Sequence, residues 1–260
     1  MPPIVHLIRH GEGEHNINNS HHIRDPFLTE NGKAQCQSLR ESFPFHNDIS
    51  AVLASPLKRT IQTAAYVFAP TLEERQLPLV LVPNAQEISH LTCDLGDDQN
   101  IIKGKAPEIV SQAAPKYDTA NIDSSLVGVD WNSKQGIYAP RLNSVRRRAA
   151  ELRCWIWNRP EKHIALVSHG GFMHYLTEDW TGYVKGRGMY ATIIQIGLGL
   201  DACVGTGYRN CEYRTFEFTE DSNEEPHLRE VGNMASKVNR PPYLDAHVIH
   251  ELDEVEGAEE

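Results

Sequence analysis

Residues 4–16, IVHLIRHGEGEHN, give the clearest indication of the fold. The first five residues are mostly apolar and β-prone, so they predict a buried strand. The strand runs into Arg9 and His10, side by side, and then into Gly11. Because glycine lets the backbone approach a ligand closely, a cation, an imidazole and a glycine at the mouth of a strand indicate a ligand site.

Strands and helices alternate along the chain. Apolar, β-prone runs predict strands at 3–8, 49–55, 77–83 and 163–171, with further strands at 190–197 and 212–218. Helical spacing predicts helices at 33–43, 57–68, 141–158 and 172–182, the first with Thr29 or Asn31 as its starting residue. The alternation predicts an α/β fold, a three-layer sandwich with a mainly parallel central sheet flanked by helices.

One domain over residues 1–250 accounts for this pattern. Residues 84–135 lose the regular alternation and predict an inserted cap or lid, with one short helix at 106–113. The stretch at 199–212 has the composition of an extra loop or hairpin tip. Residues 251–260, ELDEVEGAEE, are acidic and are expected to form a disordered tail.

Composition excludes several classes of protein. The net charge of −10 argues against a general binder of nucleic acid or of anionic membranes. The sequence contains no apolar run of about 18 residues, and its start lacks the basic and apolar regions of a secretory signal. The five cysteines show no CxxC spacing and are expected to be reduced thiols of a cytoplasmic protein without a zinc site. The oligomeric state cannot be read from the sequence.

A second histidine follows the strongest buried-strand pattern of the chain. In residues 163–171, HIALVSHGG, His169 comes at the end of the strand and Gly170 follows it. Ligands of open α/β sheets bind beyond the carboxyl ends of the strands, so this histidine and His10 are expected at one edge. Residues 54–60, ASPLKRT, bring Arg59 to the same edge. Two imidazoles with two guanidiniums, those of Arg9 and Arg59, suit a phosphate dianion.

Five motifs in order, RHGEGEHN, LTENGKAQ, SPLKRTIQTA, QEISHLTCDLG and LVSHGG, resemble the histidine phosphatase superfamily. The resemblance is to the phosphoglycerate mutase-like branch, and especially to its fungal and plant phosphatase-like members. It implies that His10 is the nucleophile that takes up the phosphoryl group. It also implies that Arg9 and Arg59 bind the phosphoryl oxygens, that His169 stabilises the transition state from the other side, and that Gly170 belongs to the phosphate-binding group.

The resemblance also supplies a proton donor, Glu87, and places Asn16 at the phosphate. Both assignments have alternatives in the sequence. Asn16 could instead cap a turn, and three other carboxylates compete with Glu87 for the acid role, namely Glu12, Glu14 and Asp94.

The function expected from these residues is metal-independent hydrolysis of a small phosphomonoester through a phosphohistidine intermediate on His10, without a cofactor. One alternative is a phosphoglycerate mutase. Against it, residues 88–135 carry only four lysines and several aspartates, where such mutases have a basic stretch. The other alternative is a repurposed enzyme or a phosphate-binding module on the same fold, because fold does not fix function.

Overall fold

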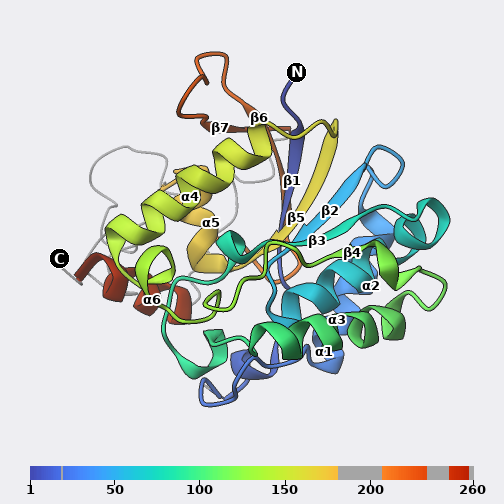
Figure 1. Cartoon of the computed structure of the whole chain (residues 1–260), viewed down its shortest axis with the longest axis horizontal. Coiled ribbons are helices and arrows are strands. Elements are labelled where there is room, and N and C mark those ends of the chain that lie inside the picture. The colour runs from blue at the N-terminus through green and yellow to red at the C-terminus, as the bar shows by residue number, and fades with distance from the viewer. Residues whose placement is uncertain (19, 181–206, 233–245, 258–260) are drawn as a thin grey trace, which may run out of the picture.

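A computed structural model describes residues 1–18, 20–180, 207–232 and 246–257. Its described residues form a seven-stranded sheet in the order β4-β3-β2-β5-β1-β6-β7 (Figure 1). The first five strands of that order are parallel, and β6 and β7 are antiparallel additions at one edge. The strands are β1 (Ile4–Arg9), β2 (Ala51–Ala54), β3 (Leu79–Leu81), β4 (Ile122–Asp123), β5 (His163–Ser168), β6 (Tyr213–Phe218) and β7 (Leu228–Val231).

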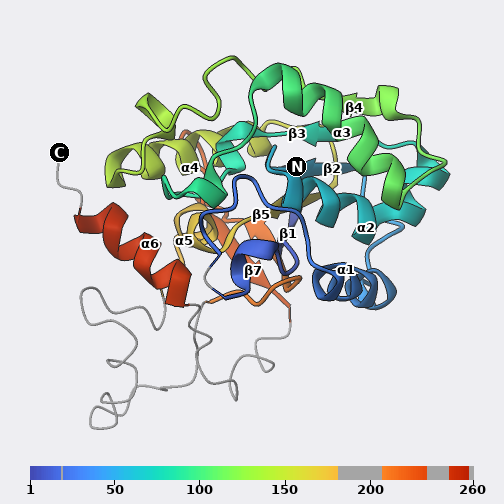
Figure 2. The same cartoon turned by 90° about the horizontal axis from the view of Figure 1, so that it is seen from below.

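Helices cover both faces of the sheet, which confirms the three-layer α/β sandwich. Figures 1 and 2 show one group of helices on one side of the strands and a second group on the other. The first group is α1 (Glu30–Ser42), α2 (Lys58–Arg75) and α3 (Gln99–Ala113), and the second is α4 (Leu142–Trp157), α5 (Gly170–Thr177) and α6 (Ala246–Gly257).

Each central strand is apolar on both faces because each face has a helical layer to pack against. In β5, Ala165 and Val167 pack into the core under α1, α2 and α3, whereas Ile164 and Leu166 pack into the core under α4, α5 and α6. All four side chains are fully buried. This two-sided burial explains why the strand is a continuous apolar run in the sequence, with no polar residue at every second position.

Pairing of β1 with β5 brings the two histidine motifs together. The strands are parallel, with Arg9 opposite Ser168, and the backbone N–H of His10 donates to the Ser168 carbonyl at 3.0 Å. His10 and His169 therefore leave the sheet at the same edge, from adjacent strands, as the sequence predicts.

The chain starts α1 where the sequence indicates. Thr29 is the N-cap residue, and its side-chain oxygen accepts a hydrogen bond from the Gly32 N–H at 2.9 Å. Such a cap satisfies one of the N–H groups that the first helical turn leaves without a partner.

The segment 84–135 is more regular than the sequence suggests. The helix expected at 106–113 begins at Gln99, and β4 adds a short strand to the sheet. Pro107 lies inside this helix, α3, and removes one backbone hydrogen bond, which costs about 3 kcal/mol. Packing against α2 offsets this cost, because the helix buries four apolar side chains at helical spacing, Ile102, Ala106, Ile109 and Val110.

The prediction of a disordered tail at 251–260 is wrong for residues 251–257, which belong to helix α6. The many acidic residues of this segment make it look disordered, but the helix also has a stripe of apolar residues. Val248, Leu252 and Val255 recur at helical spacing and are buried in the core next to α5. Burial of this stripe provides the free energy that orders the segment.

The strand predicted at 212–218 is confirmed as β6. The strand predicted at 190–197 lies outside the described residues, as does most of the 199–212 loop. No helix in the described part of the chain is long and apolar enough to cross a membrane.

Candidate active site

His10 follows β1 directly and is held in one orientation. Its Nδ1 lies 2.7 Å from the carbonyl oxygen of Gly11, to which it donates as Nδ1–H. Its Nε2 is therefore unprotonated, and the lone pair of this atom accepts a hydrogen bond from Arg59 Nε at 3.3 Å. Only 2% of the residue is exposed. The fixed tautomer leaves Nε2 as the nucleophilic atom of the ring.

His169 faces His10 from the end of β5. The centroids of the two rings lie 5.2 Å apart. Nε2 of His169 donates to the Ser55 hydroxyl oxygen at 2.9 Å, and Nδ1 accepts from Arg59 Nη2 at 3.1 Å. Both rings therefore contact the same guanidinium, so His10, His169 and Arg59 lie together at one edge of the sheet, as the sequence predicts.

Arg59 lies in the first turn of α2 and is 1% exposed. Its guanidinium contacts the two histidines, and it also binds the segment that follows β3. Nη1 donates to the Cys93 carbonyl oxygen at 2.8 Å, and Nη2 forms an ion pair with Asp94 Oδ1 at 2.6 Å. Asp94 also accepts a hydrogen bond from the Ser89 hydroxyl. This network fixes the position of the guanidinium beside His10 Nε2.

Arg9, the last residue of β1, is buried next to His10 in the chain, and its Nη1 donates to the Tyr208 carbonyl oxygen at 2.7 Å. Gly170 makes room for it. A Cβ at Gly170 would lie 3.3 Å from Arg9 Cζ and 2.8 Å from a methyl group of Val248 on α6. The glycine is therefore required for the close packing of α5, α6 and the guanidinium.

Glu87 is buried against the beginning of α5. Its carboxylate accepts hydrogen bonds from the backbone N–H groups of Ile88, Gly171 and Phe172, at 3.0, 3.1 and 2.8 Å. The carbonyl oxygen of Glu87 accepts from Lys134 Nζ at 3.0 Å. These contacts bind the segment that carries Glu87 to the helix that follows His169.

Charge and burial keep the imidazoles neutral. Burial lowers the pKa values of His10, His15 and His169 well below the usual value, and the nearby Arg59 guanidinium lowers them further. A neutral ring with a free lone pair can act as a nucleophile, whereas an imidazolium cannot.

Glu87 and Asp94, which are both buried, have pKa values shifted in opposite directions. Burial and the charge of Asp94 raise the pKa of Glu87, although its backbone N–H donors act in the other direction. For Asp94, burial is outweighed by Arg59, which keeps its pKa below the usual range. Asp94 is therefore the ionised partner of Arg59, and Glu87 is the carboxyl group that takes up a proton more readily.

Asn16 makes a different contact from the one its sequence position suggests. Its side-chain oxygen accepts from the Gly13 N–H at 2.9 Å and so closes a turn. The residue before it, His15, is 2% exposed, and its ring centroid lies 5.6 Å from that of His10. The assignment of Asn16 to the phosphate remains a prediction.

Sequence reasoning missed several residues of this site. The sequence presents Asp94 only as a competing acid, because its ion pair with Arg59 depends on a loop that has no periodic pattern. Lys134 comes from a segment 47 residues after Glu87. Glu251 comes from α6 and is buried beside Asp94. The acidic composition of that segment concealed its contribution.

The arrangement suits an oxyanion. Two neutral imidazoles and two guanidiniums lie at one edge of the sheet, where Arg59 can exchange hydrogen bonds with the histidines for bonds to a tetrahedral oxyanion. Guanidinium groups stay charged and bind phosphate oxygens in pairs.

The chain is similar to several known proteins. One relative, a phosphoglycerate mutase-like protein of Arabidopsis thaliana, is 27% identical over 272 positions, with 93% of each chain covered. A Schizosaccharomyces pombe protein named as a probable phosphatase is 24% identical and covers 64% of this chain and 73% of its own. A solved mycobacterial glucosyl-3-phosphoglycerate phosphatase superposes with a TM-score of 0.47 at 17% identity, covering 89% of this chain and 99% of that one. The family model of the histidine phosphatase superfamily (branch 1) matches residues 5–196, so the chain belongs to this superfamily.

Proposed function

We propose that the protein is a phosphatase that hydrolyses a small phosphomonoester through a phosphohistidine intermediate on His10. The observation that carries the proposal is the state of the His10 ring. Nδ1 is bound to the Gly11 carbonyl, and Nε2 is unprotonated and directed at the Arg59 guanidinium, from which it accepts a hydrogen bond. A phosphoryl group bound to Arg59 would meet this atom in line with its leaving oxygen.

In the first step, His10 Nε2 attacks phosphorus, an N–P bond forms, and the bond from phosphorus to the ester oxygen breaks. Arg9 and Arg59 neutralise the phosphoryl oxygens, with Gly170 and Asn16 beside them. His169 donates to an oxygen from the opposite side once its ring takes the Nδ1–H form, in which Nε2 accepts from the Ser55 hydroxyl. Protonated Glu87 gives its proton to the departing alkoxide. The two guanidiniums supply the positive charge, so the mechanism needs no metal ion.

In the second step, water gives a proton to the Glu87 carboxylate and attacks phosphorus. The N–P bond breaks, inorganic phosphate leaves, and neutral His10 and protonated Glu87 are restored. The opposite pKa shifts of Glu87 and Asp94 support this choice of acid, because a group held ionised by Arg59 has no proton to give.

Hydrolysis is favoured over transfer to a second hydroxyl. A mutase needs free cations that hold a doubly phosphorylated intermediate. In the cap, Lys134 Nζ is bound to the Glu87 carbonyl, and Lys105 Nζ forms an ion pair with Asp97 at 2.9 Å. These side chains are engaged within the protein.

The direct test of this function is release of phosphate from p-nitrophenyl phosphate with EDTA present. We expect turnover that orthovanadate inhibits, because vanadate adopts the five-coordinate geometry of the transition state. Phosphate that protects the fold from heat without any turnover would indicate a binding module. Isomerisation of 3-phosphoglycerate in the presence of its bisphosphate would indicate a mutase.

Substitution of Glu87 by glutamine should affect substrates according to their leaving groups. We expect kcat/KM to fall by about 10²–10⁴-fold for an alkyl phosphate and much less for p-nitrophenyl phosphate, whose phenolate leaves with little protonation. Steady-state kinetics on both substrates measures the difference. Glu14→Gln is the matched control, since this carboxylate accepts from the Phe27 N–H at the surface. Equal losses on both substrates would remove Glu87 from the acid role.

The pH profile of kcat/KM should also show that Glu87 is the acid. His10 must be neutral and Glu87 protonated in the free enzyme. Burial lowers the pKa of His10, so its protonation limits activity only well below pH 6.5. Burial raises the pKa of Glu87, so activity toward an alkyl phosphate should fall as pH rises through that raised value. The alkaline limb should disappear in Glu87→Gln, and its persistence there would show that another group titrates.

A further inference from the structure

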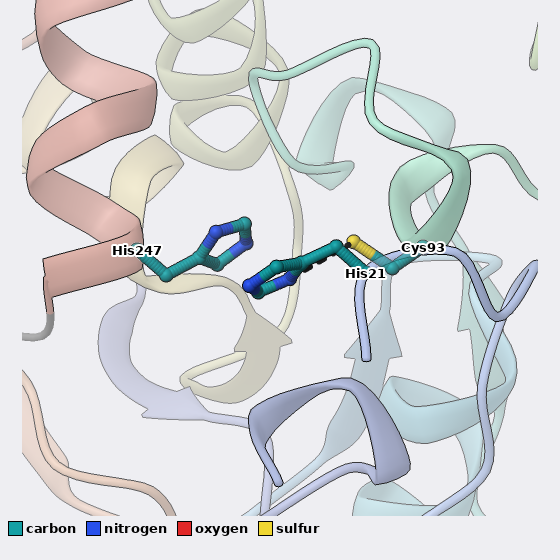
Figure 3. A group of neighbouring side chains, drawn as sticks. All are labelled: His21, Cys93 and His247. Carbon is teal, nitrogen blue, oxygen red and sulfur yellow. Dashed lines mark hydrogen bonds between the residues drawn. The ribbon is translucent and has the colours of Figure 1, made fainter. Parts of the chain in front are cut away.

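Three side chains with metal-binding atoms meet where α6 crosses the loop after β1. They are His21, Cys93 and His247, and one ligand atom of each lies within 4.8 Å of the others. Figure 3 shows the His247 ring extending from α6 toward the His21 ring, with the Cys93 sulfur on the far side of His21. None of the three has a part in the proposed phosphoryl transfer.

The backbone holds these side chains in place. The Cys93 N–H donates to the His21 carbonyl oxygen at 3.1 Å, which joins the first two segments directly. The third segment, α6, is anchored by the burial of Val248 and Leu252 against the core next to α5. The rings of His21 and His247 are stacked, with centroids 4.0 Å apart and planes 16° apart.

The distance between Cys93 and His21 is close to that between two ligands of a small tetrahedral ion. With Zn–S about 2.3 Å and Zn–N about 2.0–2.1 Å, a thiolate and an imidazole on one zinc ion lie about 3.6 Å apart. Here Cys93 Sγ and His21 Nδ1 are 3.9 Å apart, a few tenths of an ångström more than this. Because the lone pair of an imidazole lies in the ring plane, the stacked rings of His21 and His247 rotate on binding so that both point at the ion.

A carboxylate is available for the fourth position. His247 also belongs to a second group of potential ligands, with Asp94 and Glu251. Its Nε2 lies 3.1 Å from Glu251 Oε1, and Glu251 is fully buried. Asp94 is already paired with Arg59, which leaves Glu251 as the better ligand. Two carboxyl groups side by side in the interior require a proton or a cation near them.

We propose that His21, Cys93 and His247 bind one zinc ion, and that the Glu251 carboxylate turns from its contact with His247 to become the fourth ligand. On binding, the Cys93 thiol loses its proton to solvent, and the thiolate sulfur forms a bond to the metal. The ion ties α6 to the segment 92–94, whose Cys93 carbonyl and Asp94 carboxylate hold Arg59. Zinc would thereby stabilise the fold and fix α6 beside the phosphate site. The proposal does not depend on phosphatase activity.

Cobalt(II) is the spectroscopic probe for the site. The reduced, full-length protein, freed of metal with a chelator, is titrated with Co²⁺. We expect a near-ultraviolet thiolate-to-cobalt band and the intense visible bands of four-coordinate cobalt, saturating at one equivalent and reversed by Zn²⁺. Zinc should also raise the melting temperature of the wild type.

Variants identify the ligands. Cys93→Ser should abolish the thiolate band, and His247→Asn should weaken cobalt binding by at least about tenfold. Cys154→Ser, which alters a thiol outside this group, should leave the spectrum unchanged. If Cys93→Ser fails to fold, His247→Asn and Glu251→Gln decide the question in the same titration. A wild type with no thiolate band at one equivalent, or a band that survives Cys93→Ser, would overturn the proposal.

Discussion

Replacing His10 by alanine is expected to lower kcat for p-nitrophenyl phosphate by about 10⁶-fold, the loss expected on removal of a covalent nucleophile from a positioned site. The reason lies in the geometry around the ring. No other described imidazole has the same combination of Nδ1 tied to a backbone carbonyl and Nε2 beside Arg59. Water from solution would have to replace it, without the advantage of a fixed nucleophile.

The measurement is phosphate release under single-turnover and steady-state conditions, with circular dichroism to show that the variant is folded. His22→Ala is the matched control, because this histidine is exposed and lies twelve residues further along the chain. We expect the control to retain wild-type activity. His10→Ala with wild-type turnover would show that the nucleophile is another group.

Replacing Arg59 by methionine should have the second largest effect. The guanidinium contacts both histidines and is placed to bind the phosphoryl oxygens, so we expect kcat/KM to fall by about 10³–10⁵-fold, the range seen for arginines that stabilise phosphoryl transfer. The variant should also lose stability. It leaves Asp94 as a buried charge without its cation, at a cost of about 3–5 kcal/mol in the free energy of unfolding.

Two further variants separate these effects. The double variant Arg59→Met/Asp94→Asn has no buried carboxylate at position 94. We therefore expect it to regain most of the stability that Arg59→Met loses, while its activity stays low. Arg153→Met is a matched control, because this buried arginine donates to the carbonyls of Pro226 and Tyr175, away from the histidines. It should be less stable but keep its activity per folded molecule. Activity that recovers with stability in the double variant would show that Arg59 acts only through the fold.

The central part of the fold and site could be predicted from the sequence because short-range patterns determine it. The apolar runs before His10 and His169 each specify a buried strand. Two parallel strands then present the residues after their carboxyl ends at one edge of the sheet. Arg59 is placed by the same logic, since a turn after β2 leads directly into α2. Periodicity and chain direction are sufficient to place these three residues together.

The remainder depends on contacts between distant segments. The ion pair of Arg59 with Asp94 crosses from a helix to an irregular loop, and no local pattern encodes such a pairing. Helix α6 is hard to predict because its second half lies in the acidic run 251–260, although apolar residues recur every three or four positions along the helix. Its docking on α5 brings Glu251 to the site, and only the tertiary structure reveals that contact.

The central claim is that the phosphoryl group forms a covalent bond to His10 Nε2. The most direct measurement is rapid-quench trapping with p-nitrophenyl phosphate in Glu87→Gln, in which formation of the intermediate should outpace its hydrolysis. Quenching in alkali preserves a phosphohistidine, which acid destroys, and mass spectrometry of the peptides locates it. We expect a stoichiometric phosphoryl group on the peptide that contains His10, absent from His10→Ala. A phosphoryl group on any other residue, or turnover with phosphate release but no trapped intermediate, would contradict the claim.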